Sequence, residues 1–400
     1  MNNVNHRPLA EFCEPTIILI DPKREPEREF WYIDISAVDN TLKRIASPQR
    51  VQGKLASVRA RQVICTNDVL VATTRPNLNA VALVPEQYDS EVCSTGFCVL
   101  RVGDGLDPEY LYYFVQSQAF INPLVDLTKG ALYPAVTDRQ VLARCVPWFP
   151  LDEQRQIAVR LKAQLAEVET ARQAAQAQLS DTRLLRARLL KAFFVELDAV
   201  PKKALGDFAE TTSGSTPSRG TKQYWQPAEI AWVKTGEVAF APINATEEAI
   251  SKTALAECSL SLLPPRTILI AMYGQGKTRG QSAILEIPAT TNQACFAILP
   301  NDTWEPDFLY LWLKSSYQDL RDLSEDRGGN QANLNGALLK ALKVPAPGKT
   351  AQQHYVTRIR AAMTEIDALE NSGRAALEDI NRLPNRVLAH AFAQQGNRHD

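Results

Sequence analysis

The sequence contains two copies of one long segment, separated by about half of its 400 residues. The first copy includes Val146, Pro147, Gln154, Arg160, Ala163, Glu167, Leu179, Asp181, Leu185, Arg188, Leu190 and Phe194, which recur as Val344, Pro345, Gln352, Arg358, Ala361, Glu365, Leu377, Asp379, Leu383, Arg386, Leu388 and Phe392. Every pair has the same offset (352 − 154 = 198), so the pairing needs no gap. A repeat of this length indicates one supersecondary plan that is used twice.

The segments that precede the two copies also correspond, although with shifts of one or two residues. Val69–Ala72 matches Ile268–Ala271, and Asp107–Tyr112 matches Glu305–Tyr310. The chain therefore consists of a globular module, a long helix, a second module and a second long helix. We expect these four parts to span residues 1–150, 151–200, 201–348 and 349–400.

Each module is expected to have an α+β fold. In the first module, short apolar runs such as Val69–Ala72 and Phe97–Leu100 alternate with Pro, Asn, Gly and Asp. This pattern predicts strands of a compact, curled sheet, in which Ile17–Ile20 would also take part. A helix should follow Pro108, because apolar residues recur there at helical spacing. The second module shows the same succession and should share the fold.

The segment from Leu151 to Asp198 contains neither Pro nor Gly and carries an apolar stripe at helical spacing. A helix of about 45 residues would be roughly 70 Å long, which exceeds the width of a small module. Its length and duplication argue against an ordinary core-facing helix. Because the second module begins directly after it, the two helices should form an antiparallel coiled coil with the modules at opposite ends. Gly373 and Pro384 should weaken or kink the second helix.

Composition limits the class of protein. A chain of 400 residues with 45% hydrophobic and 22% charged residues is expected to fold into more than one domain. No apolar run is long enough for a membrane helix, and the first residues are polar, so we expect a cytoplasmic protein. The seven cysteines lack CxxC spacing, which indicates reduced thiols rather than zinc ligands or disulfides.

The net charge of −1 hides one basic segment. Residues 40–66, called here the basic strip, contain no acidic residue but include Lys43, Arg44, Arg50, Lys54, Arg59 and Arg61. Such a strip is either a solvated face or a surface that contacts nucleic-acid phosphates. The second module has no obvious equivalent.

One segment resembles a nucleotide-binding loop. Ala271–Thr278 follows a strand-like run and ends in Gly-Lys-Thr. A phosphate-binding loop requires an earlier glycine, where Ala271 stands, and a helix directly after it. Here a strand-like run follows instead, so a nucleotide hydrolase that uses Lys277 is disfavoured. The four histidines lie at a terminus or on the long helices, and no other set of residues indicates catalysis.

Several loops combine flexible backbone with cations, hydroxyls and amides, which suit phosphate and base contacts. We expect the DNA-binding residues to be Lys43, Arg44, Arg50, Thr74, Arg75, Asn77, Lys129, Arg219, Lys222, Tyr273, Lys277, Thr278, Arg279, Gln281 and Arg327. All of these are also ordinary loop residues, so each assignment is a hypothesis.

The layout resembles the specificity subunit of type I restriction-modification systems over nearly the whole chain. The residues that carry this resemblance are Leu205–Asp207, Thr212–Pro217, Ile230–Val238, Leu263–Ala271, Thr290–Cys295, Val146–Pro147 and Leu151–Ile157. The resemblance implies that each module is a target recognition domain for one half of a split DNA sequence. It also implies that the helical pair sets the gap between the halves. Because the basic strip occurs once, the target should be asymmetric.

The resemblance further implies a non-catalytic chain that binds no cofactor itself. Its partners would be double-stranded DNA, two methyltransferase subunits that bind S-adenosylmethionine, and restriction subunits that use ATP and Mg²⁺; a membrane is not expected. We expect docking of these subunits to involve Gln154, Arg155, Ile157, Leu161 and Gln352. The alternative is a coiled-coil adaptor that joins two protein-binding modules without DNA, and it predicts no salt-dependent nucleic-acid binding.

Overall fold

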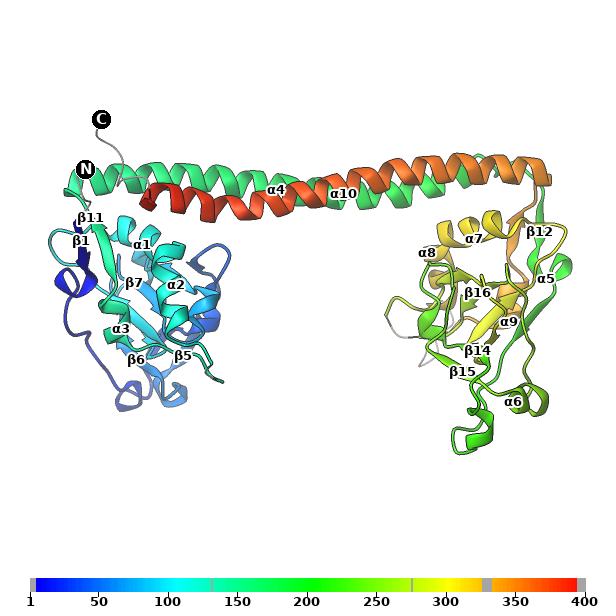
Figure 1. The fold of residues 1–400 in the computed structure, drawn as a ribbon, viewed down its shortest axis with the longest axis horizontal. Helices are drawn as coiled ribbons and strands as arrows, with labels where there is room; N and C mark the ends of the chain where they lie inside the picture. The colour runs from blue at the N-terminus through cyan, green and yellow to red at the C-terminus, as the bar shows by residue number, and fades with distance from the viewer. Residues whose placement is uncertain (1–4, 131, 275, 326–332, 394–400) are drawn as a thin grey trace. The chain divides into compact units, whose positions relative to one another are not determined.

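The computed structural model describes residues 5–130, 132–274, 276–325 and 333–393. The chain forms two compact units, of which unit 1 comprises residues 1–176 and 375–400 and unit 2 comprises residues 177–374. Each unit contains one module and a part of each long helix (Figure 1). The mixture of sheets and helices within each module confirms the predicted α+β class.

The first module is built from short strands in several small sheets. Its strands are β1 (Asn5–Pro8), β2 (Glu29–Ile33), β3 (Val38–Asp39), β4 (Arg44–Ile45), β5 (Gln49–Gln52), β6 (Ala60–Val63), β7 (Val69–Ala72), β8 (Val81–Leu83), β9 (Val92–Ser94), β10 (Phe97–Leu100) and β11 (Cys145–Trp148). Its helices are α1 (Pro108–Gln116), α2 (Gln118–Asp126) and α3 (Asp138–Leu142). The predicted strand at Ile17–Ile20 is wrong, because only an isolated bridge from Leu19 to Gln62 forms there.

The second module repeats the main succession of strands, three helices and a closing strand, and it adds the short helices α5 and α6. Its strands are β12 (Lys202–Ala204), β13 (Thr211–Ser213), β14 (Ile230–Val233), β15 (Glu248–Ile250), β16 (Ile268–Ala271), β17 (Ser282–Ile284), β18 (Thr290–Thr291), β19 (Cys295–Ile298) and β20 (Lys343–Pro345). Its helices are α5 (Leu205–Phe208), α6 (Lys252–Glu257), α7 (Pro306–Ser315), α8 (Tyr317–Glu325) and α9 (Gly336–Lys340).

The two modules share a core of three strands in each of two sheets. In the first, β2 pairs antiparallel with β5 and parallel with β9; in the second, β14 pairs antiparallel with β15 and parallel with β18. A second sheet places β7 between β10 and β8, and its counterpart places β16 between β19 and β17. The first and last strands of each module also pair, β1 with β11 and β12 with β20. Each module is therefore closed by its own ends just before a long helix begins.

The long helices are α4 (Leu151–Val195) and α10 (Lys349–Ala393), and both continue from one unit into the other. In unit 1, Ile157 near the start of α4 shares a core with Leu388 near the end of α10. In unit 2, Phe193 near the end of α4 shares a core with Val356 near the start of α10. The helices are thus antiparallel, as predicted. Gly373 and Pro384 lie inside α10, which remains one continuous helix.

Each long helix ends by packing aromatic side chains against a module. Phe392 of α10 contacts Tyr110 of α1 edge to face, with ring centroids 5.6 Å apart. Phe194 of α4 contacts Phe308 of α7 in the same way and at the same distance. Both pairs obey the offset of 198 residues. The apolar cores of the modules therefore extend onto the long helices and attach them firmly.

Candidate nucleic-acid interface

One loop of the first module carries three of the residues expected to contact DNA. Thr74, Arg75 and Asn77 directly follow β7. Arg75 adopts a left-handed backbone conformation with φ of 50°, which changes the direction of the chain at this point. The side chains of Arg75 and Asn77 are exposed, whereas that of Thr74 is half-buried.

A second loop segment, residues 132–136, is attached to the first, and residues 127–130 precede it. The backbone N–H of Arg75 donates to the carbonyl oxygen of Pro134 at 2.8 Å, and the N–H of Val136 donates to that of Thr73 at 2.8 Å. The exposed side chain of Lys129 lies in residues 127–130, 2.9 Å from the carboxylate of Asp126. The structure thus brings Arg75, Asn77 and Lys129 together on two joined loops.

The basic strip faces carboxylates of its own module. Its ion pairs are Arg50 with Glu29 at 3.0 Å, Lys54 with Glu27 at 3.3 Å, and Arg61 with Asp21 at 3.0 Å. They form because β5 pairs with β2, which brings residues 21–29 and their acids beside the strip. These three basic side chains of the strip are therefore neutralised within the module, whereas the side chain of Arg44 is exposed.

Lys43 departs from the expectation of an exposed phosphate contact. Its backbone has φ of 55°, and its Nζ donates to the carbonyl oxygen of Asn79 at 2.6 Å. The side chain lines a cavity of about 470 Å³, called here the first-unit cavity, between the module and the long helices of unit 1. Burial lowers the pKa of Lys43 to about 8, against the opposing effect of Asp39. Lys43 thus points into its own unit.

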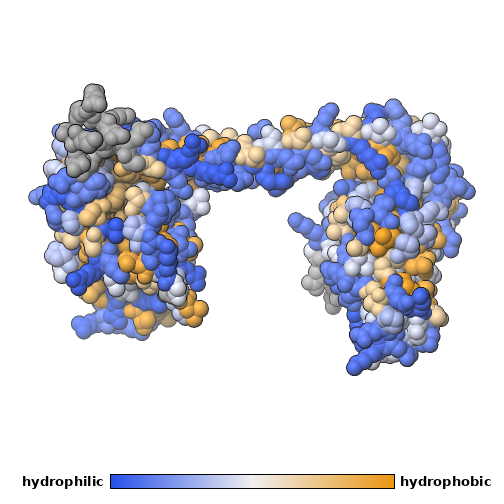
Figure 2. All heavy atoms as spheres, in the orientation of Figure 1, coloured by the Kyte–Doolittle hydropathy of each residue, from blue (hydrophilic) through white to orange (hydrophobic). Residues whose placement is uncertain are grey.

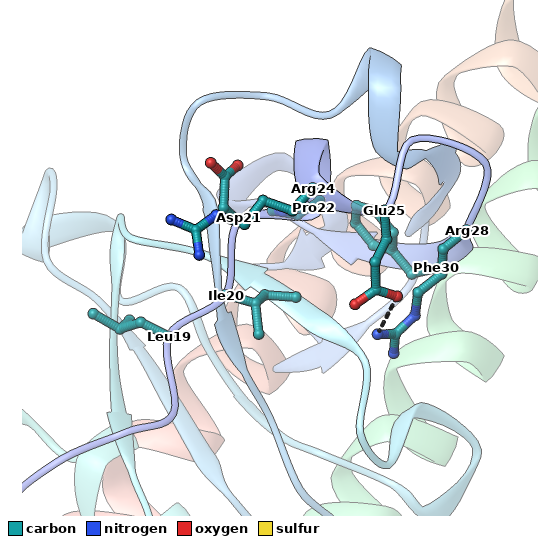
Figure 3. Close-up of a pocket in the computed structure, with 8 residues that line it drawn as sticks. All are labelled: Leu19, Ile20, Asp21, Pro22, Arg24, Glu25, Arg28 and Phe30. Atoms are coloured by element: carbon teal, nitrogen blue, oxygen red, sulfur yellow. Dashed lines mark hydrogen bonds and ion pairs between the residues drawn. The ribbon is translucent and has the colours of Figure 1, made fainter.

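A smaller pocket of about 240 Å³ lies in the first module and is lined by residues between Leu19 and Phe30 (Figure 3). Its apolar wall includes Ile20 and Phe30. Its charged residues include Arg28, which pairs with Glu25 at 3.3 Å, and Asp21, which pairs with Arg61. Because acids and bases are balanced around it, this pocket does not present the positive surface that DNA requires.

In the second module, Arg219 is held in a fixed position by its neighbours. Its guanidinium carbon lies 3.9 Å from the ring centroid of Trp225, and the guanidinium forms an ion pair with Glu248. Arg219 also lowers the pKa of the Glu248 carboxyl. Lys222 lies close by in the sequence and is exposed. Sequence reasoning identified Arg219 and Lys222 but missed Glu248, which is distant in the chain and joins this site only through the pairing of β14 with β15.

The loop between β16 and β17 corresponds to the loop after β7. Tyr273 and Lys277 are exposed, and Thr278 and Gln281 are half-buried. Arg279 is only 8% exposed, which corrects the expectation that it projects from the loop. The reason is that α8 packs over the loop.

Two side chains of α8 bind the backbone of this loop. The hydroxyl of Tyr317 donates to the carbonyl oxygen of Lys277 at 2.6 Å, and the guanidinium of Arg321 donates to that of Gly276 at 2.6 Å. The loop continues into β17 and not into a helix, which removes the amide cradle of a nucleotide-binding loop. Arg327, a further expected DNA contact, lies outside the described residues.

Gln154 and Gln352 are fully buried, which contradicts their expected role in docking partner subunits. Gln154 accepts the backbone N–H of Asp107 at 2.8 Å and donates to the carbonyl oxygens of Gly105 at 3.0 Å and Phe149 at 2.7 Å. We call these contacts the first joint, because they connect α4 to the loop before α1.

Gln352 makes the same three bonds in unit 2. It accepts the N–H of Glu305 at 2.7 Å and donates to the carbonyl oxygens of Thr303 and Pro347, both at 2.8 Å. All four residues of this second joint follow those of the first by 198 positions. The repeated glutamine therefore fixes each module on its long helix. The repeat drew attention to these residues, but only the structure reveals that their bonds are internal.

Ile157 and Leu161 are also buried, within the core of unit 1, and cannot contact a partner in this structure. Arg155 is exposed and lies 3.8 Å from the carboxylate of Asp107. Hydrophilic residues cover most of the visible surface of the long helices, with scattered apolar residues among them (Figure 2). The exposed large apolar residues of these helices are Leu151, Val159, Leu184, Leu185, Val195 and Leu369.

Other kinds of site receive no support from the part of the chain that the structure describes. It contains no group of three or more His, Cys, Asp or Glu side chains arranged to hold a metal ion. The seven cysteines are all free, and burial raises the pKa of the Cys93 thiol above its usual range. Among the described helices, none is both long and apolar enough to span a membrane.

Comparison with known proteins agrees with this arrangement. Residues 198–379 match the family model of the type I restriction modification DNA specificity domain. The chain is also 26% identical over 171 residues to the EcoR124I/EcoR124II type I restriction enzyme specificity subunit of Escherichia coli. That alignment covers 42% of this chain, and the chain spans about two fifths (41%) of the length of this curated relative.

Two solved structures are similar over nearly the whole chain. The first comes from work on complex assembly and conformational transition of the type I R-M system; it has a TM-score of 0.78 and 26% identity and covers 98% of both chains. The second is the HsdS subunit from Thermoanaerobacter tengcongensis, with a TM-score of 0.63 and 27% identity, which covers 97% of this chain and 96% of that one.

Proposed function

Because the chain belongs to the family of type I restriction-modification specificity subunits, we propose that it is the DNA-recognition subunit of such a complex. The observation that carries the proposal is the duplication of a module together with its joint, Gln154 and Gln352 making the same three bonds. A protein that recognises two half-sites needs two surfaces on equivalent supports. The activity lies in recognition, and the chemistry on DNA would belong to other subunits.

Each module would recognise one half of a split target. In the first module, the joined loops that carry Arg75, Asn77 and Lys129 supply the cations and amide that phosphate and base contacts need. In the second, Lys222, Tyr273 and Lys277 are exposed and suited to the same task. Because these two sets of side chains differ, the two half-sites should differ, and the target should be asymmetric.

The long helices would set the spacing between the half-sites. Two modules on one rigid support bind together only when both half-sites lie at the matching distance and helical phase. Buried joints serve this purpose, because they resist rotation of a module against its helix. Changing the length of α4 and α10 together should therefore change the number of base pairs between the half-sites.

The partners of the chain would be double-stranded DNA, two methyltransferase subunits and restriction subunits. S-adenosylmethionine, ATP and Mg²⁺ would be bound by those subunits and not by this chain. The exposed apolar residues of the long helices, such as Val159, Leu185 and Leu369, replace the buried residues as candidates for docking. Glutamate substitutions at these three positions should weaken co-purification of the methyltransferase, whereas the same change at the exposed Gln156 should not.

The test is to co-express the chain with a type I methyltransferase subunit from its own genome and to map methylated bases in genomic DNA. We expect methylation at one split, asymmetric motif, which disappears when the chain is deleted. A stable complex without motif-specific methylation would contradict the proposal and favour a protein-joining adaptor.

A further inference from the structure

The first module exposes two large apolar side chains side by side in the sequence. Leu132 is 87% exposed and Tyr133 is 83% exposed, the highest values among the exposed large hydrophobic residues of the described chain. A leucine exposed to water lacks the stabilisation that burial of its apolar surface would provide. Two such residues together indicate a surface that becomes covered on binding.

The backbone directly after this pair is held by hydrogen bonds to the neighbouring loop. Directly after it, the carbonyl oxygen of Pro134 accepts the N–H of Arg75, and the N–H of Val136 donates to Thr73. Thr137 then begins α3 with a capping box, in which its side chain and that of Gln140 each bind the other's backbone N–H. The pair therefore projects from a defined loop and not from a chain end.

The surroundings of the pair are cationic and polar. Arg75 and Asn77 lie on the loop to which Pro134 is bonded, and Lys129 precedes the pair by three residues. No carboxylate among the described residues lies within ion-pair distance of Arg75. Elsewhere on this module, the exposed Ile18 and Leu19 lie beside Arg61, which is paired with Asp21. Lys129 forms an ion pair with Asp126, but its side chain stays 77% exposed. An apolar tip beside Arg75 and this exposed lysine suits a polyanion with apolar interior edges better than it suits a neutral protein surface.

We propose that Leu132 and Tyr133 form an apolar tip that enters a groove of the DNA at the half-site recognised by the first module. Arg75 and Lys129 would contact the phosphates on either side, and the tip would contact base edges or a partly opened base step. Apolar side chains bind thymine methyl groups and also wedge between base pairs, and tyrosine can stack on a base. This inference rests on the proposed function and assigns two specificity-determining residues that the sequence motifs did not suggest.

The test uses the complete complex with methyltransferase and a duplex that contains the mapped motif. Fluorescence anisotropy measures the affinity for the intact duplex and for duplexes with one half-site replaced. The variants are Leu132→Ala, Tyr133→Ala and Tyr133→Phe. The control is Leu19→Ala, because Leu19 is an exposed leucine (69%) of the same module that lies outside the cationic loops. We expect each alanine variant to bind the intact duplex about 10-fold to 100-fold more weakly, while Tyr133→Phe keeps most of the affinity.

The half-site substitutions identify the origin of the loss. If the tip contacts bases, the alanine variants lose discrimination at one half-site only and keep it at the other. Affinity within about twofold of wild type overturns the inference and leaves the proposed function intact. Loss of methyltransferase from the complex, with unchanged DNA affinity of the remaining complex, also overturns it and assigns the tip to a protein partner. Absence of any motif in the methylation map would instead contradict the proposed function itself.

Discussion

The two joints share their hydrogen bonds but differ in the side chains around them. In unit 2, Lys314 Nζ lies 5.5 Å from the ring centroid of Phe240, and Arg186 is close enough to lower the pKa of Lys314, after the larger effect of burial. The corresponding residues in unit 1 are Lys43, Gln116 and Pro384, which line the cavity of about 470 Å³. Lys43 and Phe240 are equivalent because both have φ of 55° and both accept a tyrosine hydroxyl, from Tyr112 at 2.8 Å and Tyr310 at 2.6 Å.

This difference separates two requirements of the fold. The glutamine and tyrosine bonds satisfy backbone groups that any such module must bury, so both units keep them. The side chains beside them differ, because a phenylalanine ring stands in unit 2 where a lysine borders the cavity in unit 1. Removing the shared bonds should therefore cost more stability than changing the side chains that differ.

The largest effect is expected from removal of the joint glutamines. Gln154→Leu and Gln352→Leu each leave one N–H and two carbonyl groups without their buried partner, which should cost about 3 kcal/mol or more of unfolding free energy. Urea unfolding, followed by hydrogen exchange in α1 and α7, measures the loss in each unit. The matched controls are Gln156→Leu and Gln353→Leu at exposed positions. A large loss in only one unit would show that the joints are not equivalent.

The second effect compares the equivalent residues Phe240 of unit 2 and Lys43 of unit 1. Phe240→Ala removes a ring that contacts Tyr317 edge to face, with centroids 5.1 Å apart, and should destabilise unit 2 by about 2 kcal/mol. The equivalent Lys43→Ala should change the stability of unit 1 by less than about 1 kcal/mol, because its side chain borders a cavity. Hydrogen exchange of both units in each variant provides the measurement, and equal losses would contradict the comparison.

The third effect concerns pH. Burial lowers the pKa of Lys43 from its usual value near 10.5 to about 8 in the folded chain. Below about pH 8, Lys43 is protonated in both the folded and the unfolded state. The cost of burying its charge then lowers the free energy of unfolding in full. Between about pH 8 and 10.5 the folded state loses the proton first, so stability rises with pH. Relative to Lys43→Met, wild type should gain roughly 1 to 2 kcal/mol across this range, after allowance for solvent in the cavity.

The control for the pH effect is Lys129→Met, at an exposed lysine of the same module. Its stability difference from wild type should not change across the same pH range by more than a few tenths of a kcal/mol. A flat difference for Lys43→Met as well would show that Lys43 is solvated and not buried.

The smallest effect should come from Arg186, which forms ion pairs with Asp367 and Glu370 in unit 2. Arg186→Met should cost about 0.5 to 1 kcal/mol at low salt, because the carboxylates remain partly solvated. The loss should shrink in 1 M salt, where screening weakens ion pairs. Arg382→Met, which removes pairs within one helix turn in unit 1, should cost less. A loss that does not depend on salt would indicate that Arg186 acts through packing.

Much of the architecture could be predicted because it depends on local pattern. The offset of 198 residues revealed the duplicated plan, and the absence of Pro and Gly after Leu151 predicted the continuous helix α4. Gly373 and Pro384 do not end α10, which runs from Lys349 to Ala393 despite their unfavourable propensity. The predicted strand at Ile17–Ile20 does not form. A β-rich run forms a strand only where a neighbour supplies a full ladder.

The sequence by itself determined the succession of modules and long helices, the pairing of the two repeats and the resemblance to a family, because periodicity and motif spacing are properties of the chain. Only the tertiary structure decided which side chains are available to a ligand. Gln154 is buried by loops 47 residues away, and the charges of the basic strip are balanced by acids on a neighbouring strand. Leu132 and Tyr133, which no motif singled out, remain exposed. Burial and charge pairing depend on distant partners, and the fold alone brings those partners together.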